Sequence, residues 1–224
     1  MNDNLKQETW AENVILVDGD YIDRVAFDLT VNFERMLERR IPPADLARWI
    51  DCVALDGGLR PEEIEMRGTA CEGREKTVQV ILLHSKTKTK LENFTPSDYA
   101  GELDGQAFSD SLGEFCLSAV PVEELTTMEE LFAESLQHIC QQQTVKRLMV
   151  ISDERYINRV QNTLHQSSFT HLPSEGVGEG PTQVTVFTMQ PIPGSTFRQE
   201  ILGYSLLAAL GITGEEIERR QQKQ

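Results

Sequence analysis

The chain has 224 residues, of which 39% are hydrophobic and 25% charged, and this ordinary globular composition excludes disorder and a fibrous repeat. The formal net charge is -15, from 36 acidic and 21 basic residues, so tight nonspecific nucleic-acid binding is disfavoured without being excluded. The length suits one α/β domain over residues 13–212, between a flexible N-terminus (1–12) and a solvated tail (213–224).

The N-terminus lacks the basic-then-apolar order of a signal peptide, and no apolar run approaches the ~20 residues that a membrane span needs. A cytoplasmic protein with no membrane partner is therefore expected. The cysteines form no Cys-x-x-Cys pair and the histidines share no ligand spacing with them, which argues against a zinc site or a dithiol redox site. We expect reduced, mostly buried thiols at Cys52, Cys71, Cys116 and Cys140.

The first expected element is a buried strand, because Val14 to Val17 is a short β-branched apolar run that ends in a polar turn at Asp18. Apolar residues then recur at helical spacing from Val25 to Leu37, until Pro42-Pro43 stops the pattern. A strand is thus predicted to lead into a helix.

A short second helix can open at Pro43, since proline suits the first helical turn. The apolar run 52–55 predicts a strand, and the polar stretch from there to Arg74 predicts a loop. Residues 78–83 form the next buried strand, and 103–120 is read as a hairpin, with a helix as the alternative.

A capping box at Thr126 or Thr127, each followed by Glu three residues later, begins a helix over 128–139. A strand at 147–151 and a helix over 157–164 follow. The remaining elements are a mobile loop (167–181), a strand (184–187) and a last helix, capped by Thr196 with Gln199 and closed at Gly211. Its leucines (Leu206, Leu207 and Leu210) are expected to complete the core, with a homodimer contact as the alternative.

Strands that alternate with helices imply right-handed crossovers and a mainly parallel sheet covered on both faces, which is a three-layer α/β arrangement. Ligands of such sheets lie outside the carboxyl ends of the strands. Asp18, Asp20 and Asp153 follow two of the predicted strands. Oxygen ligands of this kind suit Mg²⁺ or Mn²⁺, and hence phosphoryl chemistry, whereas the plain alternative is that aspartate simply favours turns and helix starts.

The segment VILVDGDYI, from Val14 to Ile22, resembles the first motif of the NYN and PIN-like metal-dependent nucleases. That resemblance implies a Rossmann-like domain of the PIN/NYN kind, with Asp18 as a metal ligand and Asp20 as an accessory residue. Asp18, Asp20 and Asp153 would then be both the catalytic and the metal-binding residues.

The segment MVISDERYINRV looks like the later strand of the same family, with Asp153 and Tyr156 in register. Arg155 stands where that family places a second acidic residue. Asp104 and Asp110 have the spacing of the family's middle acidic motif.

The first motif is also similar to that of haloacid-dehalogenase-like phosphatases. On that resemblance Asp18 would be the nucleophile, and Ser152 would hold the phosphate. Segments along nearly the whole chain, such as VAFDLTVNFERMLERRIPPADL and QEILGYSLLAALGI, look like an uncharacterised family from Bacteroides-type bacteria, which implies a bacterial protein and no activity.

Three functions therefore remain open: a Mg²⁺-dependent phosphodiesterase or RNase, a non-catalytic binding or regulatory domain, and an aspartyl-phosphate phosphatase. No glycine-rich phosphate loop follows the first strand, so dinucleotide and P-loop binding are not supported. The cluster Lys86, Lys88 and Lys90 is read as a solvated strand exit, with an RNA contact as the alternative.

Overall fold

The computed structural model describes residues 10–61, 76–167, 182–195 and 197–222. Its strands are β1 (Asn13–Asp18), β2 (Ala44–Asp45), β3 (Thr77–His84), β4 (Phe94–Thr95), β5 (Ala107–Asp110), β6 (Gly113–Pro121), β7 (Arg147–Ile151), β8 (Gln183–Thr188) and β9 (Arg198–Ile201). Its α-helices are α1 (Gly19–Leu37), α2 (Leu46–Asp56), α3 (Met128–Cys140), α4 (Ile157–Gln166), α5 (Leu202–Ala209) and α6 (Gly214–Gln221). Two short helical turns are η1 (Tyr99–Leu103) and η2 (Glu154–Tyr156).

Within these residues, seven strands form one sheet in the order β5-β6-β3-β1-β7-β8-β9. Every neighbouring pair is parallel except β5 and β6, which form an antiparallel hairpin. Strands β2 and β4 make a separate parallel pair. The fold is therefore mixed α/β with a mainly parallel sheet, and the hairpin predicted within 103–120 is confirmed.

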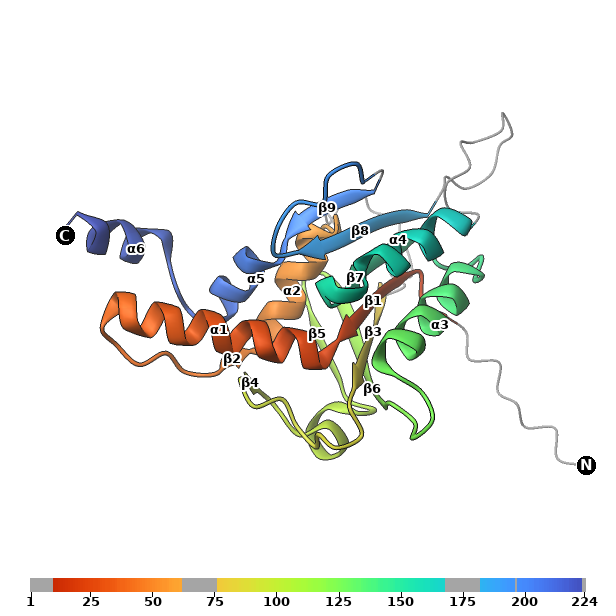
Figure 1. Ribbon diagram of the computed structural model, residues 1–224, viewed down its shortest axis with the longest axis horizontal. Helices are drawn as coiled ribbons and strands as arrows, with labels where there is room; N and C mark the ends of the chain where they lie inside the picture. The colour runs from red at the N-terminus through yellow and green to blue at the C-terminus, as the bar shows by residue number, and fades with distance from the viewer. Residues whose placement is uncertain (1–9, 62–75, 168–181, 196, 223–224) are drawn as a thin grey trace, which may run out of the picture.

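Helices cover both faces of the sheet, and Figure 1 shows β1 in its middle. Side chains of α1, α2 and α5 share one apolar core with one face of the strands, and those of α3 and α4 share a second core with the other face. The alternation along β1 explains this, because Ile15 and Val17 enter the first core while Val14 and Leu16 enter the second. All four are fully buried, as expected for a strand of a parallel sheet.

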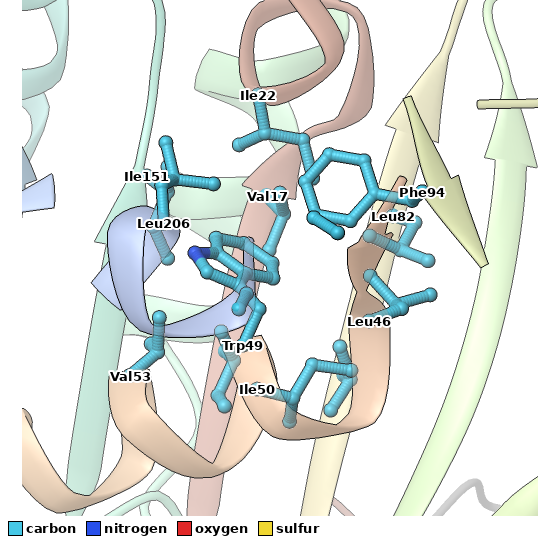
Figure 2. Packing of buried hydrophobic residues seen from close by; sticks show 14 of the residues in the cluster. Val17, Ile22, Leu46, Trp49, Ile50, Val53, Leu82, Phe94, Ile151 and Leu206 are labelled. Atoms are coloured by element: carbon cyan, nitrogen blue, oxygen red, sulfur yellow. The ribbon is translucent and has the colours of Figure 1, made fainter. Parts of the chain in front are cut away.

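Trp49 of α2 is the centre of the first core, where it lies among Val17, Ile151 and Leu206 (Figure 2). Its indole ring meets Phe94 edge-on, with ring centroids 5.9 Å apart. This packing connects α2 to β1, β7 and α5. Leu206 and Leu210 are buried in this core and Leu207 packs against it, so the predicted use of these leucines is confirmed.

The strand predicted at 52–55 is wrong, because those residues form the last part of α2. Trp49 and Val53 lie one helical turn apart and both face the core, so a four-residue apolar run was part of a longer helical stripe.

The last predicted helix begins later than expected. Residues 198–201 form the edge strand β9 on β8, and the Gln199 side chain bonds to the backbone of Ile192 instead of capping a helix. Thr196 lies outside the described residues.

A further helix, α6, occupies the expected solvated tail. Arg39 anchors this helix by donating from Nε and Nη2 to the carboxylate of Glu216, at 2.6 and 2.9 Å.

The N-terminal end of α3 follows the sequence signal, because Thr127 caps it in a full capping box with Glu130. Residues 62–74 of the first expected loop and 168–181 of the second (167–181) lie outside the described residues. No helix in the described ranges is long and apolar enough to cross a membrane.

The direction in which strands are added to the sheet reverses at β1. From β1 the chain adds β3 and then β6 on one side, and it later adds β7, β8 and β9 on the other. The helix after β1 packs on one face and those before and after β7 pack on the opposite face. In sheets of this kind ligands bind in the crevice outside the carboxyl ends of the strands where the order reverses, which here are β1 and β7.

Candidate functional site

Asp18 is the last residue of β1 and the N-cap of α1, a position that suits aspartate because its carboxylate accepts a helix N–H. Its Oδ1 accepts from the backbone N–H of Tyr21 at 2.9 Å, and its Oδ2 accepts from the hydroxyl of Tyr156 at 2.5 Å. The side chain is buried, and this burial raises its pKa despite both donors. The charges of Asp20 and Asp153 raise the pKa further.

Asp153 lies two residues beyond β7 and is equally buried, but its surroundings are cationic. Its Oδ2 accepts from Arg24 Nη2 at 2.7 Å and from Arg155 Nε and Nη2 at 2.9 and 2.7 Å. Burial alone would raise the pKa of Asp153, yet hydrogen bonds from Arg155 and then Arg24 outweigh it and lower the pKa to about 2. Asp153 is therefore a carboxylate whose charge is neutralised within the protein.

The two arginines come from different elements and remain open to solvent. Arg24 lies on α1, with its guanidinium 5.4 Å from the centre of the Tyr21 ring, and its side chain is 46% exposed. Arg155 lies in the turn after β7 and is 77% exposed. The crevice between β1 and β7 is thus bordered by two cations held by one buried anion.

Asp20 turns away from this crevice toward β3. It accepts a hydrogen bond from Ser85, and Lys88 Nζ lies 3.4 Å from its Oδ1. The same ammonium lies 4.0 Å from Asp23 Oδ2. Lys86 forms an ion pair with Glu124, and Lys90 forms one with Glu92. Carboxylates therefore offset the charge of the predicted basic patch.

Three buried hydroxyl groups along this edge have no hydrogen-bond partner among the described residues. They belong to Tyr99, Ser152 and Thr188, and each residue is at most 2% exposed. A buried hydroxyl without a partner costs free energy, so such groups are expected to bond to water or a ligand. The hydroxyl of Tyr21 is close to Glu154, whose charge and hydrogen bond, after burial, raise the pKa of Tyr21.

Tyr99 reaches the edge because Gly19 has no side chain. A Cβ at Gly19 would lie 2.7 Å from the Tyr99 hydroxyl and 3.0 Å from the Leu83 carbonyl oxygen. The Tyr99 ring stacks on His84 with centroids 3.8 Å apart. Burial raises the pKa of Tyr99, as do the nearby charges of Asp20 and the other aspartates of this edge.

The predicted metal ligands Asp18, Asp20 and Asp153 do not form a common set of donors in the described structure. Within the described residues, no three His, Cys, Asp or Glu side chains are grouped as ligands of one metal ion would be. Asp153 directs one oxygen at two guanidiniums, and both oxygens of Asp18 already accept hydrogen bonds. As arranged, these carboxylates fit a divalent ion poorly.

Residues 7–217 match the model of a family of unknown function, DUF6621, which covers nearly the whole chain. The chain belongs to the DUF6621 family. No match was found among curated proteins or among solved structures. For a DUF6621 chain the geometry of the site therefore carries the functional argument.

Two of the three aspartates predicted at this edge of the DUF6621 chain lie in the predicted position in the fold. Asp18 and Asp153 do lie at the ends of adjacent strands, whereas Asp20 faces β3. Asp104 bonds to the backbone N–H of Ala119, and Asp110 lies in the hairpin beside the start of β6, so this pair does not join the site.

Sequence reasoning missed Arg24 and Tyr99. Placing the start of α1 at Gly19 would have put Arg24 in the second turn, close to β7. No local signal marks Tyr99, because only tertiary packing brings η1 beside Gly19.

Proposed function

We propose that this chain is a non-catalytic binding domain that holds a phosphate-bearing ligand at the carboxyl ends of β1 and β7. The observation that carries the proposal is the convergence of Arg24 and Arg155 on one buried oxygen of Asp153. A hydrolase of the PIN/NYN kind would need that carboxylate for Mg²⁺ or Mn²⁺. Here two guanidiniums occupy it, which favours anion binding over cation binding.

The two guanidiniums are suited to a phosphate group. Arg24 uses one N–H group for Asp153 and Arg155 uses two of its side-chain N–H groups, so N–H groups of both remain for a ligand. Planar guanidinium groups match phosphate oxygens in pairs, and the buried Asp153 fixes their orientation. The hydroxyl of Ser152, directly after β7, is a neutral donor at the same strand end.

The strand order supports a Rossmann-like relationship. Counted along the chain, the parallel strands lie in the order 3-2-1-4-5-6 for β1, β3, β6, β7, β8 and β9. This is the order of doubly wound nucleotide-binding sheets, which bind ligands where the order reverses. We infer a PIN/NYN-like domain that kept the sheet and lost the hydrolytic site.

A metal-dependent phosphodiesterase is the second candidate, favoured by the proximity of like charges. Asp20 and Asp153 both raise the pKa of Asp18, and a divalent cation would relieve that repulsion. The phosphatase alternative has less support, because Asp18 is 1% exposed and neither of its oxygens is free to attack.

Calorimetric titration with nucleoside monophosphates and diphosphates in EDTA tests the proposal. We expect binding by the wild type, binding weaker by about tenfold or more in Arg155→Gln, and no change in Arg159→Gln. Arg159 is the control because it lies four residues after Arg155 on α4, is also solvent-accessible and pairs with Glu129 instead of Asp153.

Titration with Mn²⁺ and an assay of phosphodiester hydrolysis distinguish the second candidate. Hydrolysis that needs Mn²⁺ and disappears in Asp18→Asn would replace the binding proposal with the phosphodiesterase. Nucleotide binding that is equally tight in wild type and Arg155→Gln would also overturn the binding proposal.

A further inference from the structure

A second arginine cluster lies at the opposite edge of the sheet. Arg147 is the first residue of β7, Arg198 is the first residue of β9, and Arg60 follows the C-terminal end of α2. Because the parallel strands begin at this edge, the cluster is separated from the crevice at their carboxyl ends. In Figure 1 one end of α2 lies beside β9.

The guanidiniums of Arg147 and Arg198 both approach Gly58, which follows the C-cap of α2. A Cβ built on Gly58 would lie 2.6 Å from Arg147 Nη1 and 3.4 Å from Arg198 Nη1, so both groups border one small region. Gly58 has a φ of +96°, which an L side chain rarely adopts. Glycine is therefore required here both for the backbone and for the approach of the arginines.

The positive charge of this cluster is only partly neutralised. Arg198 pairs with Glu200 at 2.8 Å. Among the described residues, Arg147 bonds only to the Gly57 carbonyl and to Gln183, at 2.9 and 2.7 Å. Within the same described residues, the Arg60 guanidinium bonds only to the carbonyls of Leu55 and Leu59.

The arginines also repel one another. Burial lowers the pKa of Arg147, and the charges of Arg198 and Arg60 lower it further. Asp56 and Glu200 lie nearby, but burial and the charge of Glu200 raise the pKa of Asp56 in spite of Arg198 and Arg60. Among the described residues, these three cations thus share two carboxylates, Asp56 and Glu200, in a chain whose net charge is -15.

We propose that Arg60, Arg147 and Arg198 form a binding site for a tetrahedral oxyanion, either free phosphate or the phosphate group of an ester. The carbonyls at the end of α2 explain why arginines lie here, since cations stabilise a helix C-terminus. The partial negative charges of these carbonyls do not neutralise the full charge of the third arginine. An oxyanion between the guanidiniums would relieve the repulsion and accept paired N–H groups from two directions.

The experiment uses the full chain carrying Arg155→Gln, so that loss of the proposed site between β1 and β7 cannot be confused with loss of this one. Inorganic phosphate and a nucleoside monophosphate are titrated by calorimetry against NaCl at equal ionic strength. We expect phosphate to bind, with affinity reduced by about tenfold or more in Arg147→Gln and in Arg60→Gln. Arg48→Gln on the exposed side of α2 should bind as the parent does.

Two further variants separate loss of the binding site from loss of folding. Arg147→Lys should bind with intermediate affinity, because it keeps the charge and loses the planar fork. Arg60→Gln serves if Arg147→Gln fails to fold, since the bonds of the Arg60 guanidinium in the described part of the chain go to backbone carbonyls.

Tighter binding of the monophosphate than of phosphate would identify an ester as the ligand, and equal binding would identify free phosphate. Equal affinity of the parent, Arg147→Gln and Arg60→Gln for phosphate would overturn the site. A parent that responds to phosphate no more than to NaCl would overturn it as well.

Discussion

The Tyr156 hydroxyl is one of the two donors that stabilise the buried carboxylate of Asp18. Tyr156→Phe removes this donor without changing the ring, so Asp18 loses a charge-assisted hydrogen bond that water cannot replace. We expect the free energy of unfolding at neutral pH to fall by about 2 kcal/mol in urea denaturation. Tyr204→Phe is the control, because Tyr204 is 71% exposed, and it should change stability by less than about 0.5 kcal/mol.

Asp51 of α2 interacts with Asp110 of the β5–β6 hairpin, and this second carboxyl group affects its titration. Burial, followed by the hydrogen bond and charge of Asp110 and the charge of Asp45, raises the pKa of Asp51 to about 7. The folded protein therefore keeps a proton that the unfolded chain has already released. The stability from this proton is complete below about pH 4 and is lost as the pH rises toward 7.

Asp51→Asn should remove this pH dependence. Relative to the wild type, we expect the variant to gain about 1 kcal/mol of stability between about pH 5 and about pH 8, after allowance for solvent screening. Urea denaturation at several pH values measures the gain. Asp28→Asn, on the exposed side of α1, should leave the wild-type pH profile unchanged, and a profile equally unchanged in Asp51→Asn would contradict the assignment.

At the scale of elements, the N-terminus of α3 offers a paired test. Thr127 accepts from the Glu130 backbone N–H, and the Glu130 carboxylate accepts from the Thr127 backbone N–H. Thr127→Ala should lower the free energy of unfolding by about 1 kcal/mol, because a helix N–H loses its acceptor. Thr126→Ala has the same chemistry one residue earlier and should have little effect; similar losses in both would show that the cap adds no stability.

The elements that could be predicted from the sequence are those whose signals are local. Strands β1, β3, β7 and β8 are short apolar runs, and α3 has its capping box. The run at 52–55 could not be assigned by its own pattern, because four apolar residues fit both a strand and a helix. Strand β9 depends on pairing with β8, a contact that no nearby residue encodes.

The same distinction applies to the candidate site. Asp18 and Asp153 were predictable because parallel strands end at one edge. Arg24 required the correct starting residue of α1, and Tyr99 required the tertiary contact of η1 with Gly19. The neutralisation of Asp153 by two arginines is likewise a property of three elements together.

At the scale of the whole molecule, the net charge of -15 sets how salt affects stability. The Debye length is about 10 Å at 0.1 M salt, so added NaCl screens the repulsion among distant surface carboxylates. Partly buried contacts such as Arg24 with Asp153, 2.7 Å apart, are screened less. We therefore expect the free energy of unfolding to rise by about 1 kcal/mol from low salt to about 0.3 M NaCl. Urea denaturation in NaCl and in choline chloride should give the same rise, because the effect needs no specific cation. A fall in stability with either salt would mean that surface ion pairs outweigh the general repulsion.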